Sequence, residues 1–447
     1  MRENTKTRST RRKPDHLPYG STGPCALLSE CQSCPLLPLS IHEQRAHKLS
    51  DLEECLSHYT SLSATRPILS PSTTSDTHAY GYRCTVKPSV RAGQDPLNDL
   101  QIGLYRPMSH DLVDLSGCLV QDPELNHLLD LIRDLAPLYG LRGYQQGDEA
   151  VRSDLAVPVD ETVIRYVVAR KGLDRSEGAT PSLHLTLICT SYVASKLDAL
   201  IHALSAASPH LIGVSVHQNR SLGNAIFDYS SPTCHIWGES RLSYLFQLSD
   251  DAPPLACQIS SESFAQVNPL VAEQAYREMI FALDPRPGDR VIDLYCGVGV
   301  IGLGLAQAAR LKGGALHSLW GFEESPSSVC DAEENARHAH ISEAYFSLGR
   351  AEDRLADFVQ NQDQDIHENT PLLVSLNPSR RGCQPEVLNQ LLRLRPHRVA
   401  YMSCHPRTLA RDLDHLCQRG YQLKRITLFD MFPGSLHYET VSLLHAT

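Results

Sequence analysis

The feature that most constrains this chain is a glycine-rich turn that joins an apolar strand to an apolar helix. The turn reads DLYCGVGVIG over residues 293–302, and a helix is expected over 300–310. Glycines at such a turn let the backbone approach a ligand closely, and the first turn of the helix presents unpaired N–H groups. The sequence therefore predicts a nucleotide-type ligand at the carboxyl end of a strand in an open α/β sheet.

Short apolar runs bounded by Gly, Pro or polar residues surround this turn, with helical stretches between three of them. The runs occupy residues 290–295, 316–322, 372–376 and 398–403. Such alternation is typical of a parallel sheet covered by helices. We therefore expect an α/β fold with a Rossmann-like catalytic domain over residues 252–447.

The chain ahead of this domain divides into three expected parts. These are a disordered basic tail (1–24), a cysteine-rich segment (25–51) and a mixed α/β central domain (52–251). Within the central domain, residues 185–216 read as a strand, an amphipathic helix and a second strand, whereas the polar stretches 142–160 and 172–180 read as loops.

Composition restricts the class of protein further. No apolar run reaches the length of a membrane span and the amino terminus lacks a secretion signal, so we expect a cytoplasmic protein without membrane contact. The net charge of −10 argues against indiscriminate nucleic-acid binding, although the basic tail leaves a local basic surface open. No feature indicates an obligate protein partner.

The cytosol keeps thiols reduced, so metal binding or catalysis must explain those of the 14 cysteines that are not simply packed.

The cofactor is expected to be S-adenosylmethionine. The glycine pattern alone would also suit a dinucleotide, which keeps an NAD-dependent oxidoreductase as an alternative. Glu323, however, closes the next predicted strand, where its carboxylate can accept hydrogen bonds from both ribose hydroxyls. Asp293, four positions before the first glycine, also favours S-adenosylmethionine. The interval from Asp293 to Glu323 exceeds the roughly 20 residues typical of a dinucleotide fold, so the stretch 308–315 is expected to lengthen the loop.

A candidate nucleophile, Cys404, follows the last predicted strand of the sheet. It stands in the sequence SCHP (403–406), just before an expected helix. A helix amino terminus favours the thiolate form, although most cysteines in such a place are only packed residues. Three further stretches accompany it: NPSRRG (377–382), DMFPGSLHYET (430–440) and SFAQVNP (263–269).

Together these stretches resemble the RNA uracil-5-methyltransferases, whose patterns read Asp/Asn-Pro-Pro-Arg, Ser-Cys-Asn-Pro and Met-Phe-Pro-His-Thr-x-His-x-Glu. The resemblance implies a class I methyltransferase in which the Cys404 thiolate adds to carbon-6 of uracil, so that carbon-5 becomes nucleophilic. It also implies that Glu439 removes the carbon-5 proton. The target uridine must be single-stranded or flipped out of its stack. The residues implied in cofactor contact are Gln266, Tyr295, Glu323 and Asn377.

The chain departs from the family pattern at several positions. Ser379 replaces a proline, His405 replaces an asparagine, and Gly434-Ser435 replaces His-Thr. These changes leave the nucleophile and the base in place but affect the expected shape of the uracil pocket. Nearby arginines are candidate phosphate partners or surface ion pairs with equal weight: Arg380, Arg381 and Arg411.

The cysteine-rich segment forms a second candidate site. Cys25, Cys31 and Cys34 are closely spaced, and Cys118 is the expected fourth ligand, with Cys55 and Cys84 as weaker alternatives. Such spacing suits either zinc or a 4Fe-4S cluster.

The family resemblance decides between these two metals. Family members that act on large-subunit ribosomal RNA carry a four-cysteine iron–sulfur site with this layout. The absence of an evident β-barrel RNA-binding domain ahead of Cys25 also favours the shorter ribosomal subgroup. The resemblance thus implies a 4Fe-4S cluster and a uridine of 23S ribosomal RNA as substrate. Alternatives are a tRNA uridine 5-methyltransferase and a catalytically inactive RNA-binding factor.

Overall fold

The strand before the glycine-rich turn, β13 (Arg290–Leu294), lies inside an eight-stranded sheet with the order β1-β18-β19-β17-β16-β13-β14-β15. β19 runs antiparallel to its neighbours β17 and β18, whereas the other neighbouring strands are parallel. This topology confirms the expected Rossmann-like α/β fold. The remaining strands of the sheet are β1 (Ile68–Leu69), β14 (Ser318–Glu323), β15 (Ala344–Leu348), β16 (Leu372–Leu376), β17 (Arg398–Ser403), β18 (Tyr421–Phe429) and β19 (Glu439–Ala446).

The computed structural model describes most of the chain, namely residues 24–70, 79–95, 99–145, 161–174, 176, 178–221, 223, 225–228, 231–361 and 370–447. The predicted basic tail, apart from its last residue, and most of the predicted loop 142–160 lie outside these ranges. No helix within them combines the length and the apolar character that a membrane crossing requires.

Two helical layers cover the catalytic sheet, and each packs an apolar core against one face. One core includes Met279, Leu303 and Leu319, and the other includes Leu388, Leu409 and Val374. Several helices begin with proline after a capping side chain, an arrangement that satisfies and orients the first turn. The first layer contains α5 (Pro269–Leu283), α6 (Val300–Leu311) and α7 (Pro326–His338), and the second contains α8 (Ala351–Asn361), α9 (Pro385–Leu394) and α10 (Pro406–Cys417).

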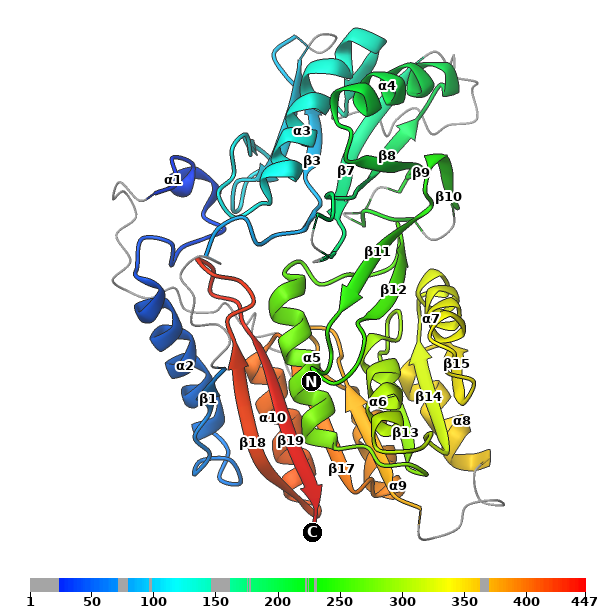
Figure 1. The fold of residues 1–447 in the computed structure, drawn as a ribbon. Coiled ribbons are helices and arrows are strands. Elements are labelled where there is room, and N and C mark those ends of the chain that lie inside the picture. The colour runs from blue at the N-terminus through cyan, green and yellow to red at the C-terminus, as the bar shows by residue number, and fades with distance from the viewer. Residues whose placement is uncertain are drawn as a thin grey trace, which may run out of the picture.

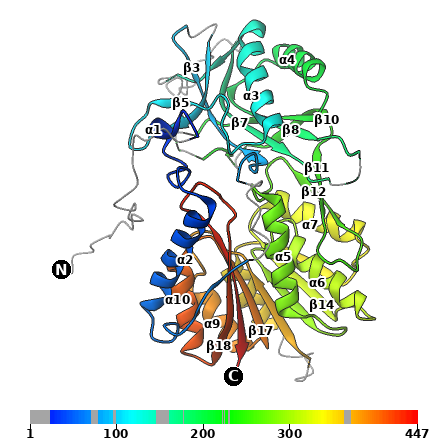
Figure 2. The ribbon, with the colours of Figure 1, turned by 60° about the vertical axis from the view of Figure 1, so that its left-hand side comes forward.

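The segment 41–69, which crosses the expected border at residue 51, packs with the catalytic sheet. α2 (Ile41–Ser57) lies beside α10, and Leu52 and Leu56 join the second core (Figure 1, Figure 2). β1 then adds a parallel edge strand, with Ile68 opposite Thr427 of β18. Residues 41–69 therefore pack with residues that follow them by several hundred positions. The expected domain borders at residues 51 and 251 stay predictions.

The central part of the chain forms a separate sheet above the catalytic one in Figure 1. The expected strand, helix and strand of residues 185–216 are confirmed as β8 (Leu183–Ser191), α4 (Ala194–Ala207) and β9 (Leu211–Gln218), with β8 parallel to β9. α3 (Pro123–Leu135) and α4 bury leucines against this sheet. Its other strands are β2 (Thr85–Val86), β3 (Ser89–Ala92), β4 (Leu100–Tyr105), β5 (Leu112–Asp114), β6 (Leu141–Gly143), β7 (Thr162–Lys171) and β10 (Thr233–Gly238).

A two-stranded ribbon leads from the central sheet into the catalytic domain. β11 (Arg241–Phe246) pairs antiparallel with β12 (Leu255–Ser260), and its apolar side chains belong to the core around α5 and α6. Leu173, in the predicted loop 172–180, forms a bridge with Tyr244 of this ribbon. The ribbon therefore fixes the point at which segment 261–268 enters the catalytic site.

Candidate active site

The candidate nucleophile and base lie opposite each other on neighbouring strands. In the antiparallel pair of β17 and β19, Ser403 stands opposite Thr440, whose hydroxyl donates to the Ser403 carbonyl at 3.0 Å. One step further along this register, Cys404 leaves β17 and Glu439 begins β19. Antiparallel pairing thus brings together residues that are 35 positions apart in the numbering, Cys404 and Glu439.

The electrostatics of this pair are set by burial and by Arg380. Glu439 is only 4% exposed, and burial raises the pKa of its carboxyl to about 8. Burial and the neighbouring Glu439 raise the pKa of the Cys404 thiol to about 11. The Arg380 guanidinium lowers the pKa of both groups, through its charge and, for the thiol, a hydrogen bond. The site therefore holds two acids that ionise with difficulty beside one cation that favours their anions.

Arg380 is a site residue for which the sequence suggested a different partner. It was expected to contact phosphate or to form a surface ion pair, whereas its guanidinium lies at the thiol. Thr408 of α10 donates to the Arg380 carbonyl at 3.2 Å, which ties the loop after β16 to the helix after Cys404. The sequence signal that could have indicated this contact is the arginine at the end of the NPSR stretch.

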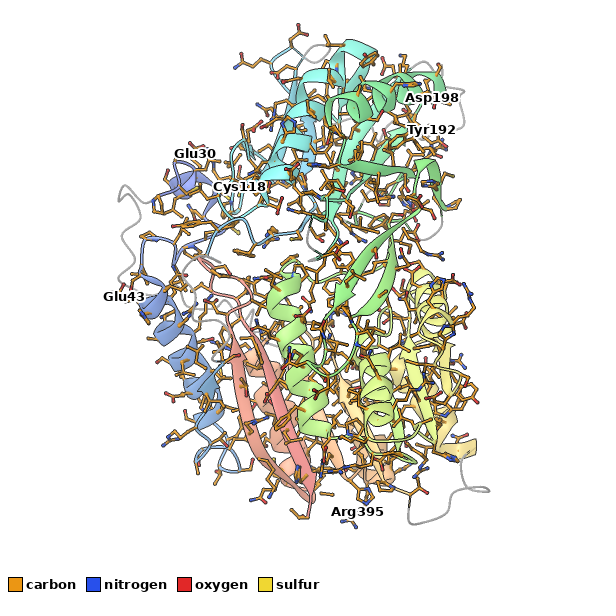
Figure 3. The ribbon with its side chains drawn as sticks, viewed as in Figure 1. Glu30, Glu43, Cys118, Tyr192, Asp198 and Arg395 are labelled. Atoms are coloured by element: carbon orange, nitrogen blue, oxygen red, sulfur yellow. The ribbon has the colours of Figure 1, made fainter. Side chains whose placement is uncertain are left out.

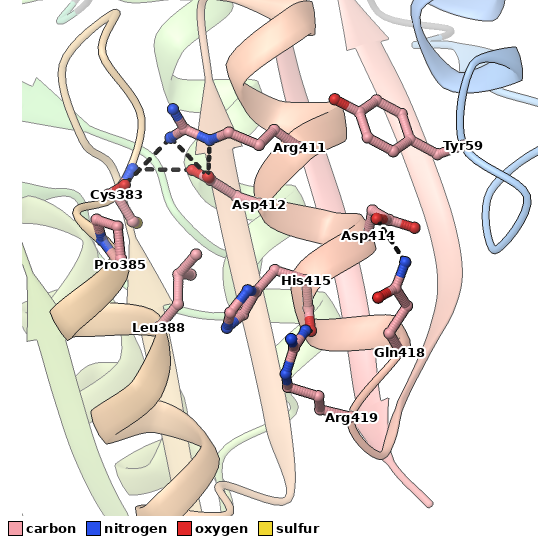
Figure 4. A pocket seen from close by; sticks show the side chains of 10 residues that line it. All are labelled: Tyr59, Cys383, Pro385, Leu388, Arg411, Asp412, Asp414, His415, Gln418 and Arg419. Atoms are coloured by element: carbon pink, nitrogen blue, oxygen red, sulfur yellow. Dashed lines mark hydrogen bonds and ion pairs between the residues drawn. The ribbon is translucent and has the colours of Figure 1, made fainter. Parts of the chain in front are cut away.

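Arg411, by contrast, forms an ion pair, which was one of the two roles predicted for it. Its Nε donates to the buried Asp412 at 2.8 Å, and its guanidinium also reaches the Cys383 carbonyl (Figure 4). It reaches the Arg381 carbonyl as well. The same carboxylate accepts the Cys383 N–H at 2.8 Å and the Tyr401 hydroxyl at 2.7 Å. Asp412 therefore joins the loop after β16 to β17 and α10.

A pocket of about 260 Å³ opens between α9 and α10 beside this network. Asp412, His415 and Arg419 are among the residues that line it, as Figure 4 shows. Its lining includes neither Cys404 nor Glu439, and none of the residues expected to contact the cofactor. The pocket is therefore distinct from the candidate catalytic pair.

The glycine-rich turn and Glu323 meet at the same edge of the sheet. The Glu323 carboxylate accepts the Gly297 N–H at 3.1 Å and the Ser325 N–H at 2.9 Å. Asp293 accepts the Gly302 N–H at 3.0 Å and the Ser375 hydroxyl at 2.7 Å, and burial raises its pKa to about 6. These bonds fix the turn through two carboxylates that come from adjacent strands.

The other expected cofactor residues come from three different segments. Tyr295 follows β13 with a positive φ of 61°, and its hydroxyl lies against the Cys383 thiol. Asn377 follows β16, and its N–H donates to the Leu294 carbonyl at 3.3 Å. Gln266 is half-buried in segment 261–268. Strand topology therefore gathers Tyr295 and Asn377 beside Glu323, as parallel strands dictate.

Segment 261–268 is fastened to the catalytic domain by Asp331, a buried residue of α7 that the sequence did not single out. The Asp331 carboxylate accepts the Ser260 N–H at 2.8 Å, the Ser263 hydroxyl at 2.7 Å and the Arg241 Nε at 2.9 Å. An aspartate on a helix carries no sequence signal for such a role. These contacts fix the end of β12 and the start of β11, directly before the segment that carries Gln266.

The four expected cysteine ligands converge although Cys118 is distant in sequence. Cys118, Cys31 and Cys25 each raise the pKa of Cys34, which burial together with these neighbours brings to about 12. Figure 3 shows Cys118 beside the segment that carries α1 (Leu28–Cys31). Within the described ranges, however, no group of three or more His, Cys, Asp or Glu side chains has an arrangement that could hold a metal ion. A metal centre is therefore not shown.

The weaker alternative ligands have other surroundings. Burial and Asp122 raise the pKa of Cys84 to about 12, and Lys171 acts in the opposite direction. Cys55 is buried on α2. The cysteines that come together are therefore the four predicted as ligands, and not the two weaker alternatives.

Comparison with known proteins identifies the family. A family model described as tRNA (uracil-5-)-methyltransferase matches residues 250–447. An uncharacterised RNA methyltransferase of Halalkalibacterium halodurans is 30% identical over 94% of this chain and 82% of its own length. Another from Enterococcus faecalis is 31% identical over 78% of this chain and 68% of its own length.

A solved structure supports the fold. The tRNA (uracil-54, C5)-methyltransferase of Pyrococcus abyssi, in complex with S-adenosyl-L-homocysteine, superposes with a TM-score of 0.63. It is 20% identical, and the match covers 92% of this chain and 85% of that one. The alternative of an NAD-dependent oxidoreductase finds no support. The chain belongs to the RNA uracil-5-methyltransferase family and is an S-adenosylmethionine-dependent enzyme.

Proposed function

We propose that this enzyme methylates carbon-5 of a uridine in 23S ribosomal RNA through a covalent adduct between Cys404 and carbon-6. The observation that carries the proposal is the proximity of Cys404 and Glu439, which stand directly after Ser403 and before Thr440 in the β17–β19 register and interact electrostatically. A nucleophile and a base at neighbouring positions can act in turn on adjacent atoms of a ring.

The residues at the glycine-rich turn fit S-adenosylmethionine. A Cβ built on Gly297 would meet no other atom within 4 Å, so the turn leaves room for a ligand. Glu323 lies beside this space, where it can accept hydrogen bonds from ribose hydroxyls, and Gln266, Tyr295 and Asn377 are proposed to complete the contacts. When bound, the cofactor supplies an electrophilic methyl group on its sulfonium.

The first step assigned to the chain is addition of the Cys404 thiolate to carbon-6 of uracil. A bond forms between Sγ and carbon-6, and the electrons of the 5,6 double bond move toward O4, so that carbon-5 becomes nucleophilic. Arg380 lowers the pKa of the thiol and therefore favours the reactive anion. Carbon-5 then takes the methyl group.

The second step restores the aromatic ring. The Glu439 carboxylate takes the proton from carbon-5, the 5,6 double bond forms again, and the bond from carbon-6 to Sγ breaks. A base with a pKa of about 8 binds a proton more strongly than an ordinary carboxylate does. Burial, which sets that pKa, thus suits Glu439 to the task.

The proposal of ribosomal RNA as substrate rests on the four converging cysteines. We propose that Cys25, Cys31, Cys34 and Cys118 bind a 4Fe-4S cluster, with zinc as the alternative. Their mutual effect on pKa supports a common site. Anaerobically purified protein should be brown and contain about four iron atoms per chain. Cys34→Ser should lose the iron, and the exposed Cys330→Ser should retain it.

A tRNA uridine is the second candidate substrate. The family model and the superposed archaeal structure both carry tRNA in their names. Transfer of labelled methyl groups to unmodified 23S ribosomal RNA and to tRNA, followed by nucleoside analysis, separates the two. Label in 5-methyluridine of 23S RNA alone supports the proposal. Label in tRNA alone replaces the substrate, and label in neither RNA contradicts both candidates.

A further inference from the structure

The loop 430–438 links β18 to β19 and ends directly before Glu439. Residues far away in the sequence hold four consecutive carbonyl oxygens of this loop. The Asn268 amide donates to Met431 at 3.2 Å, Lys48 Nζ to Phe432 at 3.0 Å, the Tyr82 hydroxyl to Pro433 at 3.1 Å, and the Leu36 N–H to Gly434 at 2.8 Å.

Lys48 of α2 anchors the start of the loop with a second bond. Its ammonium lies 2.5 Å from a carboxylate oxygen of Asp430, and Arg45 lies 3.5 Å from the other oxygen. Lys48 is 1% exposed and Asp430 is 2% exposed. A buried ion pair is held in one geometry because each charge needs its partner in the absence of water. The first residue of the loop is therefore fixed on α2.

Gln44, one turn earlier on α2, anchors the middle of the loop. Its Oε1 accepts the Gly434 N–H at 2.7 Å, and its Nε2 donates to the Leu39 carbonyl at 2.9 Å. The end of the loop is held on the same helix, because the Tyr438 hydroxyl donates to Asp51 at 2.8 Å. α2 therefore contacts the beginning, the middle and the end of the loop.

Gly434 allows this close approach. Its φ is +80°, and a Cβ at this position would lie 2.9 Å from Leu37 and 3.5 Å from the Cβ of Cys34. A histidine, which the family pattern has here, would require at least the Leu37 side chain to move. The departure from the family pattern thus coincides with direct packing of the cysteine-rich segment on the loop.

From these contacts we infer that Lys48 and Gln44 are positioning residues that hold the loop 430–438 so that Glu439 faces Cys404. The inference rests on the proposed role of Glu439 as the base. It also assigns a catalytic purpose to the packing of residues 34–51 against this loop. The two residues act through the loop, by its backbone and by the Asp430 side chain, and none of the contacts above is with the nucleophile.

The test separates adduct formation from adduct release in the full-length enzyme. RNA made with 5-fluorouridine forms an adduct that cannot lose its carbon-5 substituent, so it reports on Cys404 and methyl transfer. Ordinary uridine RNA reports on turnover, which also needs the base. For Lys48→Met and for the milder Gln44→Leu, we expect adduct formation within about threefold of wild type. Turnover should fall roughly 10- to 100-fold, with a uridine adduct accumulating.

Two further variants make the outcome unambiguous. Lys312→Met removes a partly exposed lysine that pairs with Asp284, and it should behave as wild type. Glu439→Gln should accumulate the uridine adduct. If it does so while Lys48→Met and Gln44→Leu turn over normally, the positioning role is refuted. A parallel loss of adduct formation and turnover in Gln44→Leu would also refute it, because general destabilisation affects both. Normal turnover by Glu439→Gln would instead contradict the proposed base.

Discussion

Cys404 and Glu439 occupy facing positions where β17 ends and β19 begins, and each is within the electrostatic reach of Arg380. The thiol and the carboxyl are both protonated more readily than in water, because burial disfavours their anions. The reaction assigned to them needs both anions, so this relationship makes the activity sensitive to pH and to Arg380.

The rate of adduct release, the step assigned to Glu439, should therefore increase with pH up to about 8, whereas adduct formation should keep rising toward the Cys404 pKa of about 11. Glu439 accepts a proton only when it is ionised, and below its pKa of about 8 the ionised fraction falls about tenfold per pH unit. Measurement of single-turnover product release between pH 6 and 9 checks this dependence. A release rate that is constant from pH 6 to 8 would contradict the raised pKa of Glu439.

Glu439→Gln should stabilise the folded protein increasingly as pH rises from about 4.5 to about 8. The pKa of Glu439 is raised in the folded state, so ionisation costs folded-state stability above the ordinary pKa of 4.5, and the cost is complete above about 8. Glutamine does not ionise and avoids this cost. The expected gain at pH 8 is on the order of a few kcal/mol. Denaturant unfolding of both proteins at pH 5 and pH 8 should show the difference growing with pH.

Arg380→Gln should slow formation of the 5-fluorouridine adduct roughly 10- to 100-fold at neutral pH. Loss of the guanidinium raises the pKa of both Cys404 and Glu439, so the variant should recover part of its rate at higher pH. Arg395→Gln is a suitable comparison, since Arg395 bonds the terminal Thr447 carbonyl and should react as wild type. An Arg380→Gln rate that equals wild type at all pH values would exclude the proposed activation.

Gly434→Ala should destabilise the protein more than Gly313→Ala does. Both glycines have positive φ, so each alanine costs about 1–2 kcal/mol of left-handed strain. A Cβ at Gly313 meets nothing within 4 Å, whereas one at Gly434 presses on Leu37. The difference between the two variants in chemical denaturation measures that contact. If both variants lose the same free energy of unfolding, segment 34–37 moves away from the added methyl group without an energetic cost.

Local pattern was sufficient to predict the strands before the glycine-rich turn and before Cys404, because each combines an apolar run with a clear stop. It also indicated Glu323, since the end of a neighbouring parallel strand has only one place in such a sheet. The placement of α2 could not be read in the same way. Lys48 looks like a surface residue of a helix, and its burial depends on Asp430, which lies almost at the other end of the chain.

The contact of Arg380 with the Cys404 thiol could not be predicted for a related reason. An exposed arginine in such a motif suits a phosphate equally well, and only the folded structure shows that a thiol and a carboxyl lie within its reach. Asp331 likewise acquires its function from the ribbon that packs on α7. Long-range pairing, which has no local signal, decided each of these cases.

Formation of the 5-fluorouridine RNA adduct by wild type and by Cys404→Ala tests the central claim most directly. Cys330→Ser serves as the matched thiol variant, because this exposed sulfur is assigned neither to the reaction nor to the four-cysteine site. The account predicts a stable protein–RNA adduct, resistant to denaturing electrophoresis, for wild type and for Cys330→Ser, and none for Cys404→Ala. An adduct that persists in folded Cys404→Ala would contradict the assignment of Cys404 as the nucleophile.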